Sequence, residues 1–238
     1  MKLERPSARR RRRARAPIQQ ELRFERKWGG RRAGAGRPKA ASRKGVPHRA
    51  RPTHHSSHPV HVTLRAARRL PNLRRQSLFL KVRRALGRAS RATFRVVHFS
   101  VQADHIHLVV EAHDRVALAR YARGLAIRVA RAVNRELRRR GQVFTDRYHA
   151  RSLESPRDVR NTIVYVVQNW RKHLPNARGV DPCSSGWWFT GWKSPPAGVP
   201  PGWDDREHAP VMLPRTWLGR DGWRKRGLVD QEERPKPS

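Results

Sequence analysis

The stretch Asp104-His105-Ile106-His107-Leu108-Val109-Val110-Glu111 decides how the middle of this 238-residue chain is interpreted. Alternate residues of a β-strand point to the same face of a sheet. A strand here would therefore direct both histidines to one face and Ile106 to the other. Two imidazoles on one face suit a divalent metal ion. By itself the pattern is a weak signal, because the chain contains 12 histidines and such pairs are more often structural or incidental.

The sequence on both sides of this stretch predicts an α+β fold. Alternating or β-branched apolar residues indicate three further strands. These expected strands are residues 60–64, 94–101 and a part of 143–153. Apolar residues at helical spacing predict helices over 78–86 and 115–139, and Gly141 is placed to end the second helix. The order β-α-β-β-α-β is that of a ferredoxin-like antiparallel sheet with helices on one face.

One more helix is predicted after this unit, and it carries a tyrosine. Ser155 is a suitable N-cap and Pro156 suits the first helical position, and the helix would run through Tyr165 to about His173. Tyr165 and Asn169 are four residues apart and would share a helix face. A tyrosine phenol can attack phosphorus and form a covalent intermediate, and an amide oxygen is a ligand type that Mg²⁺ or Mn²⁺ accepts. For a tyrosine considered alone, a core or surface role is the favoured interpretation.

Charge indicates a polyanionic partner. The chain has 55 Lys and Arg against 18 Asp and Glu, a formal net charge of +37. Such an imbalance favours nucleic acid as the partner. No apolar run approaches the roughly 20 residues that span a bilayer, so no membrane association is expected. The N-terminus has no signal-peptide pattern, and a single cysteine excludes an internal disulfide and a cysteine-based zinc site.

Composition divides the chain into three parts. Residues 1–57 are expected to form a disordered basic arm, because residues 1–50 contain 18 Lys or Arg and few apolar residues. Within this arm, Arg37 and Lys39 lie in a Gly-Arg-Pro-Lys sequence that loosely resembles an AT-hook; contact with phosphates alone is the favoured interpretation. The folded domain is expected over 58–192, followed by a loose tail rich in Pro and Gly over 193–238.

The combination of these features resembles a known family, the HUH-type single-tyrosine transposases, and most closely the REP-associated tyrosine transposases. The resemblance covers about residues 58–192. The motifs that carry it are His58-Pro59-Val60-His61-Val62-Thr63, Asp104 to Val110, Arg147-Tyr148-His149, Tyr165-Val166-Val167-Gln168-Asn169, and Val180 to Ser185 with the following Trp188-Phe189 and Gly191-Trp192. One departure is that Trp170-Arg171-Lys172 follows Asn169, where the family usually has Pro-Val-Arg.

The resemblance implies a mechanism and a site. Tyr165 would attack a phosphate of single-stranded DNA beside a hairpin, giving a 5′-phosphotyrosine and a free 3′-hydroxyl. His105, His107 and Asn169 would bind Mg²⁺ or Mn²⁺. Nearby arginines would hold phosphates, although ordinary surface arginines are an equally good interpretation; these are Arg147, Arg151 and Arg157. The resemblance further implies a cytoplasmic, nucleoid-associated bacterial protein, with both monomers and homodimers open.

Three alternatives remain at this level. The first is a catalytically inactive or domesticated nucleic-acid-binding protein of the same fold, which would need neither Tyr165 nor the histidine pair. The second is a phosphodiesterase with two His-x-Thr motifs, which His61-Val62-Thr63 matches only once. The third is a ribosome-associated basic protein. In addition, Trp187, Trp188 and Trp192 could stack on unpaired bases, but covering the domain is the favoured role for them.

Overall fold

The computed structural model describes residues 53–174, 176–200, 202 and 208–235. The described residues belong to one compact unit, Pro47–Ser238. Predictions for the basic arm, including those for Arg37 and Lys39, lie outside the described residues. Among the described helices, none has the length and apolar character that crossing a membrane requires.

The order of the elements confirms the α+β prediction. Along the chain they are β1 (Val60–Arg65), α1 (Gln76–Gly87), β2 (Phe94–Val101), β3 (His105–Ala112), α2 (Arg115–Glu136), β4 (His149–Ser152) and α3 (Pro156–Val167). The strands form a four-stranded sheet in the order β2-β3-β1-β4. Each neighbouring pair is antiparallel. Strand β3, which carries His105 and His107, and strand β1, which carries His61, are therefore adjacent and central.

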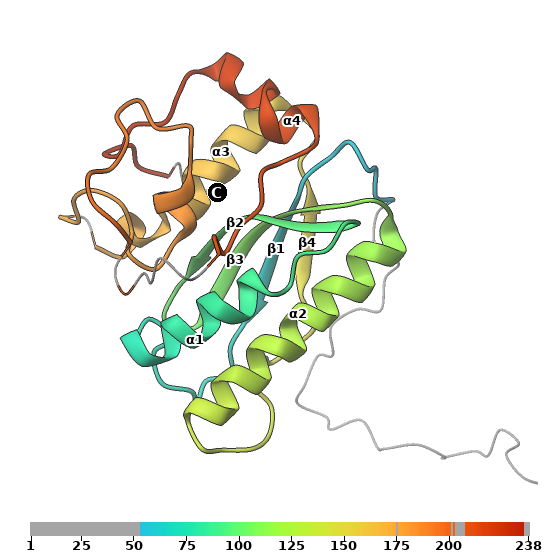
Figure 1. Ribbon diagram of the computed structural model, residues 1–238, viewed down its shortest axis with the longest axis vertical. Helices are drawn as coiled ribbons and strands as arrows, with labels where there is room; N and C mark the ends of the chain where they lie inside the picture. Colours follow the sequence, from blue (N-terminus) through green and yellow to red (C-terminus); the bar gives the residue numbers. More distant parts are fainter. Residues whose placement is uncertain (1–52, 175, 201, 203–207, 236–238) are drawn as a thin grey trace, which may run out of the picture. The chain divides into compact units, whose positions relative to one another are not determined.

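Each face of the sheet is covered by a different layer. Alternate residues of β1 and β3 pack with α1 and α2 in one apolar core, which includes Val62, Leu64 and Leu108. The opposite face contributes Val109 to a second core with α3. Figure 1 shows α1 and α2 on one side of the strands and α3 on the other. Strands β2 and β3 are thus buried on both faces, and the face toward α3 is the one that carries the odd-numbered residues of β3.

Helix α2 and strand β4 are both shorter than predicted. Helix α2 ends at Glu136 and its C-cap is Leu137, because Arg138 then takes a left-handed backbone conformation with φ 48°. Gly141, with φ 103°, serves the turn that follows instead of ending the helix. Strand β4 occupies only His149–Ser152 of the predicted region. Before it, Phe144 forms an isolated antiparallel bridge with Ala66, and the Asp146 side chain accepts a hydrogen bond from Arg147 N at 2.7 Å.

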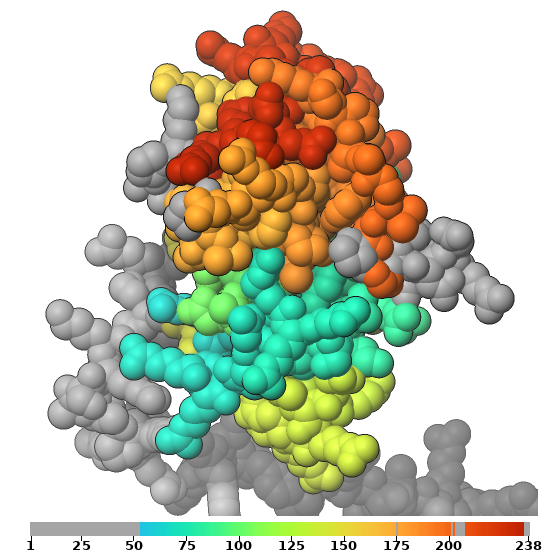
Figure 2. All heavy atoms as spheres, turned by 90° about the vertical axis from the view of Figure 1, so that its left-hand side faces the viewer, coloured from blue at the N-terminus to red at the C-terminus, as the bar shows by residue number. Residues whose placement is uncertain are grey.

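The expectation of a loose tail over 193–238 is wrong for its described residues 208–235. A short helix, α4 (Trp217–Arg220), and a 3₁₀ helix, η3 (Gly222–Arg226), pack on α3. Trp223 is 2% exposed within the second core. A Cβ on Gly191 would lie 2.2 Å from the Trp223 ring, so this close approach requires glycine. Figure 2 shows the orange and red C-terminal residues as a layer beyond the green and cyan ones. Apolar side chains among the Pro and Gly residues therefore give this segment a fixed place.

Candidate functional site

The two histidines of β3 lie on the same sheet face, as their spacing predicts. Their ring centroids are 4.6 Å apart with the planes nearly perpendicular. His107 is 5% exposed, whereas the His105 side chain is 23% exposed. The pair thus has one buried imidazole and one that is open to solvent.

The turn before β3 supplies a partner for His105. Asp104 Oδ1 lies 2.6 Å from His105 Nδ1. Hydrogen bonding to His105 is the largest of the effects that lower the pKa of the Asp104 carboxyl group. A carboxylate at this nitrogen accepts the Nδ1 proton and leaves Nε2 with its lone pair, the arrangement found behind many metal-binding histidines.

Helix α3 brings Tyr165 to the histidines. Its N-cap is Ser155, whose side chain accepts a hydrogen bond from Asp158 N, and Pro156 occupies the first turn, as predicted. Tyr165 Oη lies 3.4 Å from His107 Nε2. The two ring centroids are 5.0 Å apart. The phenol and the histidine pair, which are about sixty residues apart in sequence, therefore meet in one place.

Asn169 does not lie on an α-helix, contrary to the prediction that α3 runs to about His173. The α-helix ends at Val167, and a 3₁₀ turn, η1 (Asn169–Lys172), follows. The buried side chain of Arg171 explains the change, because it donates hydrogen bonds to the carbonyl oxygens of Gly179 and Gln231 and pairs with Glu232. These contacts hold the turn against the C-terminal segment.

The side chain of Asn169 has unsatisfied polar atoms. Asn169 is 1% exposed. Neither its Oδ1 nor its Nδ2 has a hydrogen-bond partner among the described residues. A buried polar group without a partner costs roughly 1–3 kcal/mol. The orphaned oxygen therefore fits a ligand role.

Burial also sets the charge state of the site. It is the main cause that lowers the pKa of His107 to about 2, and the nearby His61, His105 and Lys172 lower the pKa further. The pKa of His61 falls to about 4, again mainly through burial. Both imidazoles are thus neutral at physiological pH, which is the form that binds metal ions.

The residues present fit a divalent cation. Imidazole nitrogens and amide oxygens are both donor types that borderline and hard divalent ions accept. Within the described residues there is no group of three or more His, Cys, Asp or Glu that could bind a metal ion. Asn169, whose buried Oδ1 has no hydrogen-bond partner among the described residues, is the candidate for a third ligand beside the two histidines of β3.

The prediction from the sequence did not include three residues that lie near the site. His61 and Thr63 of β1 both approach His107, with His61 Nε2 and Thr63 Oγ1 each 3.2 Å from His107 Nδ1. The ammonium group of Lys172 lies 4.4 Å from the centroid of the Tyr165 ring. The His-x-Thr spacing was a signal for the β1 pair, but Lys172 had none in this arginine-rich chain.

The three arginines expected near the site lie on different surfaces. Arg151 of β4 donates a hydrogen bond to Thr162 of α3 at 3.1 Å, and so lies on the Tyr165 side of the sheet. Arg157 is exposed in the first turn of α3. Arg147 instead lines a cavity of about 1170 Å³ beside α2, together with Arg120 and Arg123. Arg147 is thus separated from the other two by the sheet.

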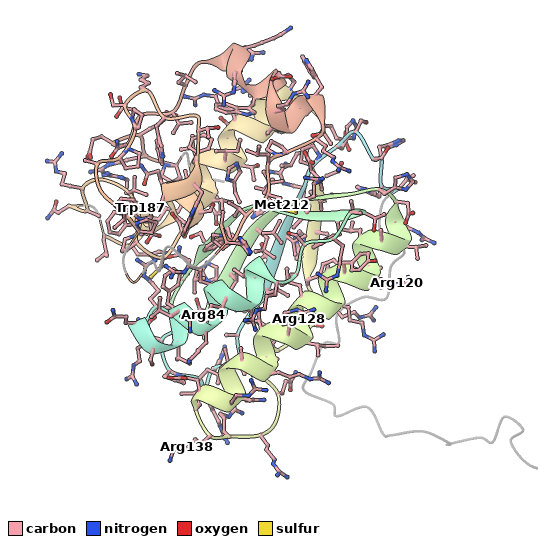
Figure 3. The ribbon with its side chains drawn as sticks, viewed as in Figure 1. Arg84, Arg120, Arg128, Arg138, Trp187 and Met212 are labelled. Carbon is pink, nitrogen blue, oxygen red and sulfur yellow. The ribbon has the colours of Figure 1, made fainter. Side chains whose placement is uncertain are left out.

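Basic side chains also cover the exposed side of α2. Figure 3 shows Arg120 and Arg128 extending from this helix and Arg138 from the turn beyond it. The exposed arginines of this region are Arg115, Arg120, Arg123, Arg128, Arg131, Arg135, Arg138 and Arg140. In α2 itself, Glu136 is the only acidic residue. The helix therefore presents a positive surface that could contact phosphates.

The tryptophans after α3 mainly cover the domain, in agreement with the favoured interpretation. Trp192 is 4% exposed in the second core. Its indole nitrogen donates a hydrogen bond to the Gly186 carbonyl oxygen at 2.8 Å. Trp187 packs against this core, and Trp188 packs against the core under α1 and α2. Base stacking is not needed to explain these rings.

Comparison with known proteins agrees with this arrangement. The family model described as "Transposase IS200 like" matches residues 54–169, which contain all four strands, both histidines and Tyr165. Residues 54–169 are thus similar to the IS200-like transposase family. Among solved structures, a REP-associated tyrosine transposase bound to a REP hairpin matches with 15% identity and a TM-score of 0.45, covering 54% of this chain and 74% of the other. No curated protein gives a significant match.

Proposed function

We propose that this protein cleaves and rejoins single-stranded DNA at hairpin-flanked sites, with Tyr165 as the nucleophile. A transposase of this family is a DNA-processing protein, and the positive charge of the chain suits a DNA substrate. The observation that carries the proposal is the 3.4 Å separation between Tyr165 Oη and His107 Nε2. A merely structural tyrosine would have no need of a buried, neutral imidazole nitrogen at its hydroxyl group.

The proposed reaction conserves the phosphodiester bond energy. The Tyr165 oxygen attacks phosphorus, the O3′–P bond breaks, and the O3′ atom leaves as a hydroxyl group. The 5′-phosphate stays on the tyrosine until another 3′-hydroxyl attacks it and reforms a phosphodiester. Covalent catalysis of this kind divides one strand transfer into two displacement steps.

His105, His107 and Asn169 are the residues that would bind Mg²⁺ or Mn²⁺. When bound, such an ion polarises a phosphoryl oxygen as a Lewis acid. The protein's own part is to keep His107 neutral, which its burial favours, and to fix the His105 ring, which the carboxylate of Asp104 does through Nδ1. Arg151, on the same side of the sheet, is a candidate for holding the substrate phosphate.

A labelled-strand assay tests this function. The protein is incubated with Mn²⁺ and a hairpin strand labelled at its 5′ or 3′ end, and the mixture is then denatured. We expect the 3′-labelled fragment to migrate with the protein and the 5′-labelled fragment to be free. Tyr165→Phe should abolish the adduct, because it removes the nucleophilic oxygen. Tyr121→Phe, in the helix on the other face of the sheet, is the matched control and should leave the adduct in place.

The alternatives give different results in the same assay. A hydrolase would yield two free fragments, and a plain binding protein would shift the intact strand in a native gel. His105→Ala should reduce metal-dependent adduct formation at least tenfold while leaving salt-sensitive binding largely unchanged. An adduct that survives Tyr165→Phe would rule out Tyr165 as the nucleophile.

A further inference from the structure

Strand β1 contributes two side chains to the back of the His107 ring. The sheet register pairs Thr63 with His107 directly, and His61 is two residues away on the same face. Thr63 Oγ1 and His61 Nε2 each lie 3.2 Å from His107 Nδ1. The His107 ring therefore has β1 at one nitrogen and Tyr165 at the other.

The chemistry of imidazole makes this two-sided placement informative. A neutral imidazole has one N–H group and one lone pair, and the partner at one nitrogen decides which tautomer forms. A threonine hydroxyl oxygen and an imidazole nitrogen can both accept a hydrogen bond from the Nδ1–H group of His107. If they do so, the lone pair of His107 is on Nε2 and faces Tyr165.

His105 has the same arrangement through a different partner. Asp104 Oδ1 is 2.6 Å from His105 Nδ1. Since a carboxylate can only accept, the His105 proton is on Nδ1 and its lone pair is on Nε2. Each of the two histidines therefore has a partner at Nδ1, which leaves its Nε2 as the nitrogen available to a ligand.

We propose that His61 and Thr63 are positioning residues, which hold His107 in the Nδ1-protonated tautomer so that its Nε2 can bind the metal ion. This inference rests on the proposed function for the identity of the site. It assigns a role to the His-x-Thr sequence of β1, which neither the nucleophile nor the metal ligands explain. Partners of this kind behind a ligand histidine commonly affect metal affinity by about 10–100-fold.

The test measures Mn²⁺ affinity in the absence of DNA, together with the tautomer of His107 in the metal-free protein. Thr63→Val preserves the side-chain shape and removes the hydroxyl group, whereas Thr63→Ser keeps the hydroxyl group and serves as the rescue. His61→Phe removes the second acceptor. We expect Mn²⁺ binding to weaken about tenfold in Thr63→Val combined with His61→Phe, and to stay within about twofold of wild type in Thr63→Ser.

Tautomer measurement keeps the test decisive if the double variant does not fold. Long-range ¹H–¹⁵N spectra of the wild type should show His107 with its proton on Nδ1. A proton on Nε2, or unchanged Mn²⁺ affinity in a folded double variant, would overturn the proposal. Thr145→Val, at a threonine outside the site, is the matched control and should leave Mn²⁺ binding unchanged. Neither readout needs strand cleavage, so failure of the proposed function and failure of this inference are distinguishable.

Discussion

Among single residues, His98 shows how burial links protonation to folding. It lies in β2, is 7% exposed, and packs edge-on against Phe189 with ring centroids 5.2 Å apart. Burial lowers its pKa from 6.5 to about 4. The unfolded chain therefore binds a proton more readily than the folded chain. Stability is fully present above pH 6.5 and is lost as pH falls from 6.5 toward 4.

This pKa difference predicts that His98 contributes to acid sensitivity, alongside the buried His61 and His107. Between pH 7 and pH 4, His98 should account for a loss on the order of 3 kcal/mol in the free energy of unfolding. Denaturant unfolding at both pH values measures the loss. His98→Gln, which cannot titrate, should reduce the pH-dependent loss by about that amount, whatever its effect at pH 7. An identical pH dependence in the two proteins would contradict the assignment.

Among the elements, α3 packs on one side against the sheet and on another against the C-terminal segment. Helix α3 packs against η3 and, less extensively, against α4, β2 and β3. A buried carboxylate anchors the segment to β3, because Glu111 accepts hydrogen bonds from the backbone of Arg215 and Thr216 and from the Thr216 hydroxyl group. Helix α3, which carries the proposed nucleophile, is therefore held between the sheet and the C-terminal segment that contains α4 and η3.

Two tryptophans of this segment test that dependence. Trp223 is 2% exposed and Trp217 is 49% exposed. Trp223→Ala should lower the free energy of unfolding by about 3–5 kcal/mol, because it opens a cavity under α3. Trp217→Ala, the matched control, should cost about 1 kcal/mol or less. Denaturant unfolding measures both, and equal costs would show that the segment does not support α3 as described.

At the level of the whole molecule, the arginines that could bind DNA lie on both sides of the sheet, whereas the proposed catalytic residues lie on one side. The positive surface extends over α2 and the cavity that Arg147 lines, whereas Arg151 and Tyr165 lie on the other side of the sheet. Contacts with phosphates release counterions wherever they occur on the protein. Binding should therefore depend on arginines on both sides, but strand cleavage should depend on one side alone.

Salt dependence checks this distribution. For single strands, log affinity falls with log salt by about 0.7 per phosphate contact. Arg147→Gln and Arg151→Gln should each reduce the magnitude of this slope by about 0.7. Fluorescence anisotropy of a labelled strand between about 50 and 300 mM salt measures the slope. Arg147→Lys and Arg151→Lys keep the charge and should keep the slope. If neither glutamine variant changes the slope, the phosphate contacts lie at other residues.

Much of the fold could be predicted from local patterns. The strands at residues 94–101 and 105–111 and the starts of α2 and α3 follow from alternation, helical spacing and the Ser155 cap, which depend on neighbouring residues. The alternation of side chains along a strand likewise predicted that His105 and His107 share one face. Element ends were harder to predict. Helix α3 ends at Val167 because Arg171 bonds to residues far along the chain, and the sequence near the helix does not reveal those bonds.

The sequence by itself determined the order of the elements, the shared face of the two histidines and the strong positive charge. Only the tertiary structure decided that β1 lies beside β3, that Thr63 and His61 meet His107, and that Trp223 packs under α3. The physical reason is the range of the interactions. Periodicity and capping act within a few residues, whereas sheet register and core packing join residues that are dozens to more than a hundred positions apart, and only the folded chain selects those partners.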